Sequence, residues 1–195
     1  DKGISVVYAE ENNDSPGCKI KKYTLSSGVQ QLLYDTQYTV YSMDGRGGII
    51  YISAGKENEN PDIISINTAG GEFTKITNTP FQERNVRLYG DMLFFDANYN
   101  GFHNAYTYSI KDGLFYQLTK NGTAESPAYS EKTGEIFYCA LNSYGFDIYR
   151  QKAVFNKFAP PSDKYTEPYF GGLDVKGVKE GNIADSFALL IPKVR

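Results

Sequence analysis

Acidic side chains form the densest groups of residues able to do chemistry in this 195-residue chain. One group runs from Glu10 to Asp14, and the other contains Glu57, Glu59 and Asp62. Paired carboxylates can act as acid and base in glycoside hydrolysis, and their oxygen atoms can bind calcium. Neither group has the Asp-x-Asp-x-Asp-Gly spacing of a calcium loop. The pattern therefore favours two solvated hairpin loops, with a glycan-active enzyme as the alternative.

The chain contains a single histidine, His103. A zinc site needs further histidine or cysteine ligands nearby, and no Gly-x-Ser-x-Gly turn is present to expose a serine nucleophile. The glycine-rich run at residues 45–48 lacks the spacing and the Lys-Ser/Thr pair of a phosphate-binding loop. The sequence therefore predicts no catalytic residue, no metal site and no cofactor.

A repeat of 42 to 44 residues organises these scattered groups. Four aromatic residues head equivalent apolar segments: Tyr8, Tyr51, Phe94 and Tyr138. Equivalent turns follow at Gly28, Gly71, Gly113 and Asn156. Glycine and asparagine both tolerate positive φ, so the fourth turn is expected to keep the geometry of the other three. The pairs Ile76-Thr77 and Leu118-Thr119 recur at the same interval.

Alternation of apolar and polar residues inside each repeat predicts short strands. The expected strands are residues 4–10, 19–25 and 29–34; 38–42, 49–54, 62–68 and 72–77; 85–89, 92–97, 104–110 and 114–119; and 128–130, 135–141, 147–151 and 154–158. A period of this length filled with antiparallel strands is typical of propeller blades. We therefore predict an all-β chain, a β-propeller of about four antiparallel blades over residues 1–158. The first blade lacks its innermost strand.

The loops between the second and third strands of each repeat occupy equivalent positions, so they should gather on one face of the propeller. Asparagines, two tyrosines and the histidine stand there. We name as candidate binding residues Asn58, Asn60, Asn98, Tyr99, Asn100, His103, Asn142 and Tyr144, with Asn12 and Asn13 nearby. Asparagine side chains also bond to their own turns, which is the local explanation. The functional alternative is a rim for protein or glycan contact.

These residues resemble the TolB-like propeller repeat, which runs through Ser-Pro-Asp-Gly, an apolar strand, a polar loop, Asp-Ile-Tyr, a glycine turn and Leu-Thr. Residues 124–130 resemble the start of such a blade, residues 145–149 its third strand, and residues 117–119 its end. Residues 42–45 keep the inner turn with methionine in place of proline, whereas residues 88–91 and 130–134 depart from it. The resemblance implies a non-catalytic scaffold for protein–protein interaction in the bacterial cell envelope, periplasmic or otherwise extracytoplasmic. A second family-based alternative is the propeller domain of a serine peptidase.

Residues 159–195 fit no repeat, and we expect an extended tail or linker there. The segment at residues 189–193 resembles the linker that precedes a BamA-like outer-membrane barrel in some envelope proteins, which implies indirect membrane association. The propeller must also close. The chain is expected to be a piece of a larger propeller, with two alternatives: a four-bladed ring completed by residues 183–191, or half of a dimeric ring.

The remaining composition excludes some partners. The formal net charge of −3 gives no electrostatic footprint for nucleic acid. No apolar run reaches the length of a membrane helix, and no signal peptide precedes Asp1, so the chain reads as processed or excised. The two cysteines, Cys18 and Cys139, lie in different repeats, and two free thiols are the favoured interpretation over a disulfide.

Overall fold

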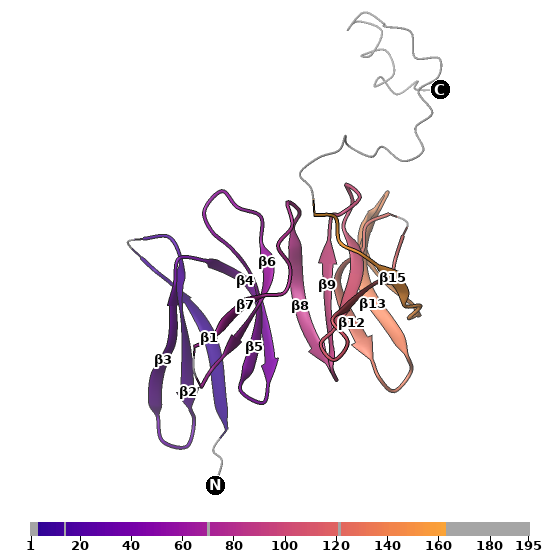
Figure 1. Cartoon of the computed structure of the whole chain (residues 1–195). Helices are drawn as coiled ribbons and strands as arrows, with labels where there is room; N and C mark the ends of the chain where they lie inside the picture. The colour runs from indigo at the N-terminus through magenta and orange to yellow at the C-terminus, as the bar shows by residue number, and fades with distance from the viewer. Residues whose placement is uncertain (1–3, 14, 70, 121, 163–195) are drawn as a thin grey trace, which may run out of the picture.

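A computed structural model describes residues 4–13, 15–69, 71–120 and 122–162. These residues form antiparallel sheets arranged side by side as blades (Figure 1). The first blade contains β1 (Ser5–Glu11), β2 (Cys18–Thr24) and β3 (Val29–Thr36). The second contains β4 (Thr39–Arg46), β5 (Ile49–Gly55), β6 (Asp62–Asn67) and β7 (Phe73–Lys75). The third contains β8 (Glu83–Tyr89), β9 (Met92–Ala97), β10 (Asn104–Ser109) and β11 (Leu114–Gln117). The fourth contains β12 (Glu125–Ser130), β13 (Glu135–Asn142) and β14 (Gly145–Lys152).

The predicted all-β architecture is confirmed, including the three-stranded first blade. The middle strands of the second and third blades are buried on both faces because a neighbouring blade covers each face. No helix able to cross a membrane occurs in the described part of the chain.

The last strand, β15 (Asn156–Phe158), departs from the prediction. Residues 154–158 were expected as the outer strand of the fourth blade, but β15 pairs with β11 and becomes a fifth strand of the third blade. Phe158 explains this choice, because its ring lies 5.4 Å from Tyr99 and 5.0 Å from Tyr106 in the core of that blade. The expected positive-φ turn at Asn156 is therefore wrong. Among the described residues, β14 is the outermost strand of the fourth blade.

The repeat register also needs a correction at both ends. Gly28, Gly71 and Gly113 confirm the predicted turns: each has φ of 67° and donates its N–H to the backbone oxygen of the last residue in the strand before the turn. Strand pairing counted from these turns aligns Tyr51 and Phe94 with Val7. In the fourth blade, Phe137 lies two residues after the first paired residue of β13, as Tyr51 and Phe94 do in β5 and β9. Tyr8 and Tyr138, the residues named in the predicted repeat, each lie one residue after these aligned positions. In a strand one residue of slip reverses the face, so these two tyrosines point away from the faces predicted for them.

The recurring threonines have a structural role in closing each blade. The Thr77 hydroxyl accepts a hydrogen bond of 2.7 Å from the N–H of Ile63, at the start of β6. The Thr119 hydroxyl accepts the equivalent bond of 2.9 Å from the N–H of Ala105 in β10. Each bond holds the segment after the outer strand against the third strand, which explains why the motif recurs at this interval.

Hydrophobic residues fill the spaces between successive blades. The cluster between the second and third blades is built around Phe95 and Tyr106, and the cluster between the third and fourth around Phe94 and Ile136.

Both cysteines are free, as the sequence indicated. Cys18 is buried, and its Sγ donates to the backbone oxygen of Tyr38 at 3.2 Å.

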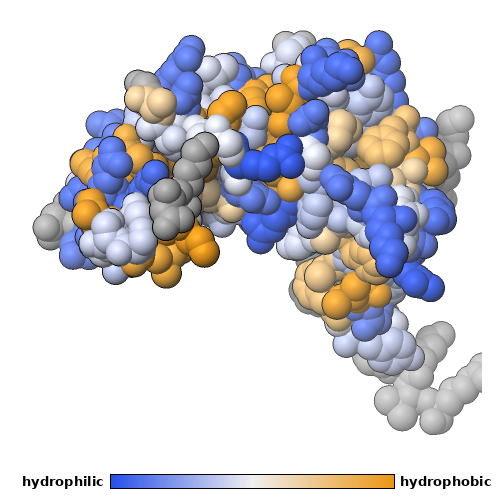
Figure 2. All heavy atoms as spheres, turned by 90° about the horizontal axis from the view of Figure 1, so that it is seen from below, coloured by the Kyte–Doolittle hydropathy of each residue, from blue (hydrophilic) through white to orange (hydrophobic). Residues whose placement is uncertain are grey.

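The two end blades expose apolar side chains on their outer sides. Val6 and Leu32 of the first blade are about half exposed, as are Leu141 and Phe146 of the fourth, and Ile148 is 78% exposed. Figure 2, which views the molecule from below, shows apolar residues at both ends of the row of blades. In a repeat architecture each blade relies on its neighbours for burial, and the described residues leave these two outer faces uncovered.

Candidate functional site

Four loops of equivalent position lie at one end of the molecule (upper end in Figure 1). They join β1 to β2, β5 to β6, β9 to β10 and β13 to β14. We call this end the loop face. Because the second strand of every blade runs in the same direction, its connection to the third strand always emerges here.

Three of the candidate residues are exposed on the loop face. Tyr144, at the tip of the β13–β14 hairpin, is 98% exposed. Asn58 has a left-handed backbone with φ of 64°, which asparagine tolerates better than most residues. Asn60 donates to the backbone oxygen of Pro80 and lies 3.4 Å from the Gln82 amide, so it links its loop to the β7–β8 connection.

Four candidates are partly buried and bond to nearby loop atoms. The Asn98 side-chain oxygen accepts from the N–H of Gln82 at 2.8 Å, and that of Asn142 accepts from the N–H of Tyr144 at 2.8 Å. Asn100 accepts from the Asn104 amide at 3.2 Å. The bonds of Asn100 and Asn142 lie within their own loops, and they support the local explanation for these two asparagines. The bond of Asn98 instead joins the β9–β10 loop to the β7–β8 connection. The fourth partly buried candidate is His103, which bonds to Asp96.

Tyr99 is the one candidate that the structure removes from the loop face. Only 8% of Tyr99 is exposed, and its ring packs edge-on against Phe81 and Tyr106. The burial and the neighbouring Glu83 carboxyl raise the pKa of Tyr99. Proposing it as a rim residue was wrong, because the loop folds inward and uses this ring as core.

His103 binds to a buried carboxylate that also connects two blades. Its Nδ1 lies 2.8 Å from Oδ2 of Asp96, and Asp96 is 1% exposed. The other oxygen, Oδ1, accepts from the Asn85 side chain at 2.7 Å and from the N–H of Ser126 in the fourth blade at 2.9 Å. This set of bonds positions the β9–β10 loop against the start of β12. The geometry gives His103 a structural role.

Replacing Asp96 with alanine should destabilise the protein by about 3 kcal/mol, because the change leaves several polar partners without their acceptor. Urea unfolding monitored by circular dichroism measures this loss. Asp91 provides the control, because its side chain is 76% exposed and makes only a 3.5 Å ion pair with Arg46. Asp91→Ala should change stability by less than about 0.5 kcal/mol, and equal losses in the two variants would contradict the role of Asp96.

A second buried acid, Glu83, was missed by the sequence analysis. Glu83 is 0% exposed, and the hydroxyl groups of Thr77 and Thr79 lie within hydrogen-bond distance of its carboxyl oxygens. Asp62 is also nearby and forms an ion pair of 2.7 Å with Lys75. Burial is the main cause that raises the pKa of Glu83 to about 8. This raised pKa favours the protonated form of the Glu83 carboxyl in the folded protein.

The loop face also carries a pocket of about 530 Å³ between the loops of the first and second blades. Its walls include Asn12, Asp35, Lys56, Glu57 and Glu59. Of the two acidic groups picked out from the sequence, the second contributes Glu57 and Glu59 to this pocket, whereas the first contributes only Asn12. Among the described residues, no group of three or more His, Cys, Asp or Glu side chains is placed to hold a metal ion.

Comparison with known proteins supports the fold. The sequence matches no protein-family model and no curated protein. The structure is similar to TolB from Acinetobacter baumannii, with 18% identity and a TM-score of 0.61 over 80% of this chain and 41% of TolB. It is also similar to puromycin hydrolase, with 10% identity and a TM-score of 0.62 over 81% of this chain and 28% of the hydrolase. A third similar structure is an acylaminoacyl peptidase from Pyrococcus horikoshii, with 14% identity and a TM-score of 0.59 over 82% of this chain and 26% of the peptidase.

These similarities identify the class of fold. The chain consists of β-propeller blades, and its structural neighbours include TolB propellers and proteins named as hydrolases and peptidases. The chain spans less than half of the length of each of these three proteins. At such low identity the similarity establishes fold, and function has to be argued from the site.

Proposed function

We propose that this protein is a non-catalytic β-propeller scaffold that binds a protein partner in the bacterial cell envelope through its loop face. The observation that carries the proposal is the convergence of four loops at one end, with an exposed tyrosine and a pocket of about 530 Å³ among them. Tyrosine is enriched at protein–protein interfaces, because its ring is largely apolar and its hydroxyl bonds to polar partners. Asparagines that bond within their loops keep this surface preorganised, which lowers the entropy cost of binding.

The envelope location rests on the likeness to the TolB propellers and to the TolB-like repeat. An extracytoplasmic position, periplasmic in particular, is part of the proposal. The linker to a downstream BamA-like barrel depends on residues 189–193, which lie outside the described residues, so it stays a prediction. The two enzyme alternatives, the propeller of a peptidase and a glycan-active propeller, also stay predictions. The glycan-active alternative is kept because Glu57 and Glu59 line the loop-face pocket.

Affinity capture from an envelope extract, with the full chain as bait, tests the proposal. The capture of a defined partner should fall at least tenfold for Tyr144→Ala, which removes the most exposed aromatic ring of the loop face. Lys132→Ala is the matched control, because Lys132 lies in the exposed β12–β13 turn at the opposite end. A partner that is lost with the Lys132 variant and retained with the Tyr144 variant would place binding elsewhere and contradict the proposal.

A further inference from the structure

The inner strand of the third blade, β8, contains a bulge between Arg84 and Arg87. The cross-strand partners of these two arginines are only two residues apart on β9, so they share one face of the sheet. The bulge therefore places Arg84 and Arg87 on the same face of β8, whereas a regular strand would put residues three apart on opposite faces. Asn85, inside the bulge, has a left-handed backbone with φ of 56°.

Both guanidinium groups lie at the inner edge of β8, on the side of β4. The guanidinium carbon of Arg84 is 5.8 Å from the centre of the Tyr41 ring in β4, within the range of a cation–π contact. Nη1 of Arg87 donates to the backbone oxygen of Val86 at 3.3 Å. That oxygen points to the same side as the N–H of its own residue, which donates to the Ser42 hydroxyl of β4 at 2.9 Å. The two arginine side chains therefore converge beside β4.

Neither of these arginines forms an ion pair within the described residues. Nε of Arg84 is buried there without a hydrogen-bond partner. Arg87 and Tyr41 are exposed, so one side of the group is open to solvent. β8 lies between β4 and β12, and both of these strands are described, so the surroundings of the two arginines include an inner strand on either side.

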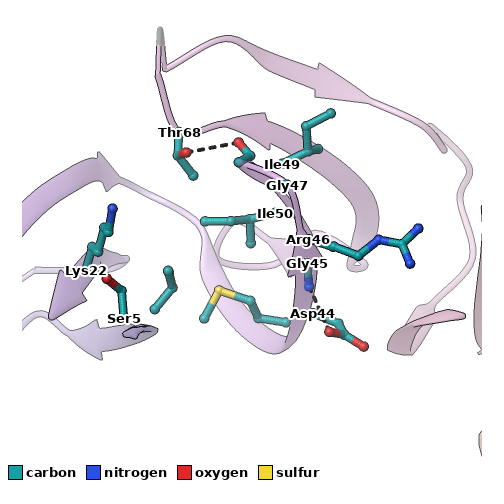
Figure 3. Close-up of a pocket in the computed structure, with 12 residues that line it drawn as sticks. Ser5, Lys22, Asp44, Gly45, Arg46, Gly47, Ile49, Ile50 and Thr68 are labelled. Atoms are coloured by element: carbon teal, nitrogen blue, oxygen red, sulfur yellow. Dashed lines mark hydrogen bonds between the residues drawn. The ribbon is translucent and has the colours of Figure 1, made fainter. Parts of the chain in front are cut away.

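Two acids on neighbouring strands are occupied by other donors. Asp96, opposite Arg84 on β9, bonds to the single histidine and to the fourth blade. Asp44 on β4 accepts from the N–H of Gly45 at 2.8 Å (Figure 3) and from the N–H of Leu88 at 2.9 Å. Two guanidinium groups without an acid of their own are suited to an anion supplied by another molecule.

We infer that Arg84, Arg87 and Tyr41 bind a carboxylate of the partner at the inner edge of β8. A planar guanidinium pairs with a carboxylate through two parallel N–H···O bonds, and the Tyr41 ring holds one guanidinium in place beforehand, which lowers the entropy cost of binding. The carboxylate belongs to a peptide, as its free C-terminus or as an acidic side chain. Only the peptide nature of the ligand rests on the proposed function. The anion site is tested by itself, so its failure and a failed partner capture are separate results.

N-acetyl-triglycine, which ends in a free carboxylate, is the probe, and its C-terminal amide is the matched control. Titration of the full chain is followed by NMR of the arginine Nε–H signals, because the buried Nε–H of Arg84 reports directly on the site. The dissociation constant should be about fivefold lower for the acid than for the amide. Arg84→Gln and Arg87→Gln should each weaken binding of the acid about fivefold. Arg150→Gln should change it by less than about twofold, because Arg150 is an exposed arginine of β14 in another blade.

If Arg84→Gln unfolds the chain, Arg87→Gln makes the same test, because Arg87 is exposed. The α-amide of N-acetyl-glutamate, whose carboxylate is on a side chain, distinguishes the two sources. Binding at least as tight as that of N-acetyl-triglycine supports an acidic side chain as the ligand, and weaker binding supports a chain end. Equal binding of N-acetyl-triglycine and its amide, no binding of either carboxylate, or tighter binding of inorganic phosphate would overturn the carboxylate site.

Discussion

The free energy of unfolding of this protein should fall by about 4 kcal/mol as the pH rises from 5 to 9. The cause is Glu83, whose pKa burial raises to about 8, whereas a glutamate in an unfolded chain has a pKa of ~4.3. Between those two values the folded state holds a proton that the unfolded state has released. Raising the pH therefore favours unfolding until the folded-state pKa has been passed. Urea titrations at unit pH intervals would measure the slope.

Glu83→Gln should remove this pH dependence, because glutamine keeps the shape of the protonated acid and never ionises. The variant should match the natural chain within about 1 kcal/mol at pH 5 and exceed its stability by about 4 kcal/mol at pH 9. Glu57→Gln is the control, since Glu57 is exposed on the loop face and should leave the slope unchanged. A pH profile of the Glu83→Gln variant as steep as that of the natural chain would show that another group causes the loss.

Much of the fold follows from patterns within the chain. The period and the alternation specify the blades because each turn glycine and each threonine bond is a local event that recurs from one unit to the next. The position of β15 does not follow, because it depends on Phe158 meeting Tyr99 and Tyr106, which are about 50 to 60 residues earlier. Such tertiary packing overrides the repeat, and a sequence pattern carries no signal of it.

The candidate site also contains features that the sequence predicts and features that it does not. Asparagine-rich turns can be predicted, because the bonds that Asn100 and Asn142 accept lie within their own loops. The burial of Glu83 and Asp96 could not be predicted, because it depends on how the blades pack. Their partners Thr79 and His103 are close in sequence, but Ser126 reaches Asp96 from the fourth blade, 30 residues further along the chain. The one available signal was the recurrence of Thr77 and Thr119, which mark the corner of the blade where the Glu83 cluster forms.

The alignment of the repeats predicts a second large effect on stability, at Phe94. Phe94→Ala should destabilise the protein by about 4 kcal/mol, because Phe94 is 0% exposed and stacks on Tyr129 at 4.8 Å between the third and fourth blades. Tyr8, its counterpart in a count of 43-residue steps, faces outward and contributes no packing to the next blade, since Val7 takes that place beside Ile50.

Tyr8→Ala should therefore cost less than about 1 kcal/mol, mainly through the loss of its contact with Gln30. Thermal and urea unfolding of the two variants, measured side by side, would compare the two positions directly. Equal losses would mean that Tyr8 is buried by a neighbouring blade as Phe94 is, and that the alignment of Val7 with Phe94 is incorrect. A large difference supports the alignment, because in a strand a slip of one residue decides whether an aromatic ring lies between two blades or on the outer face of one.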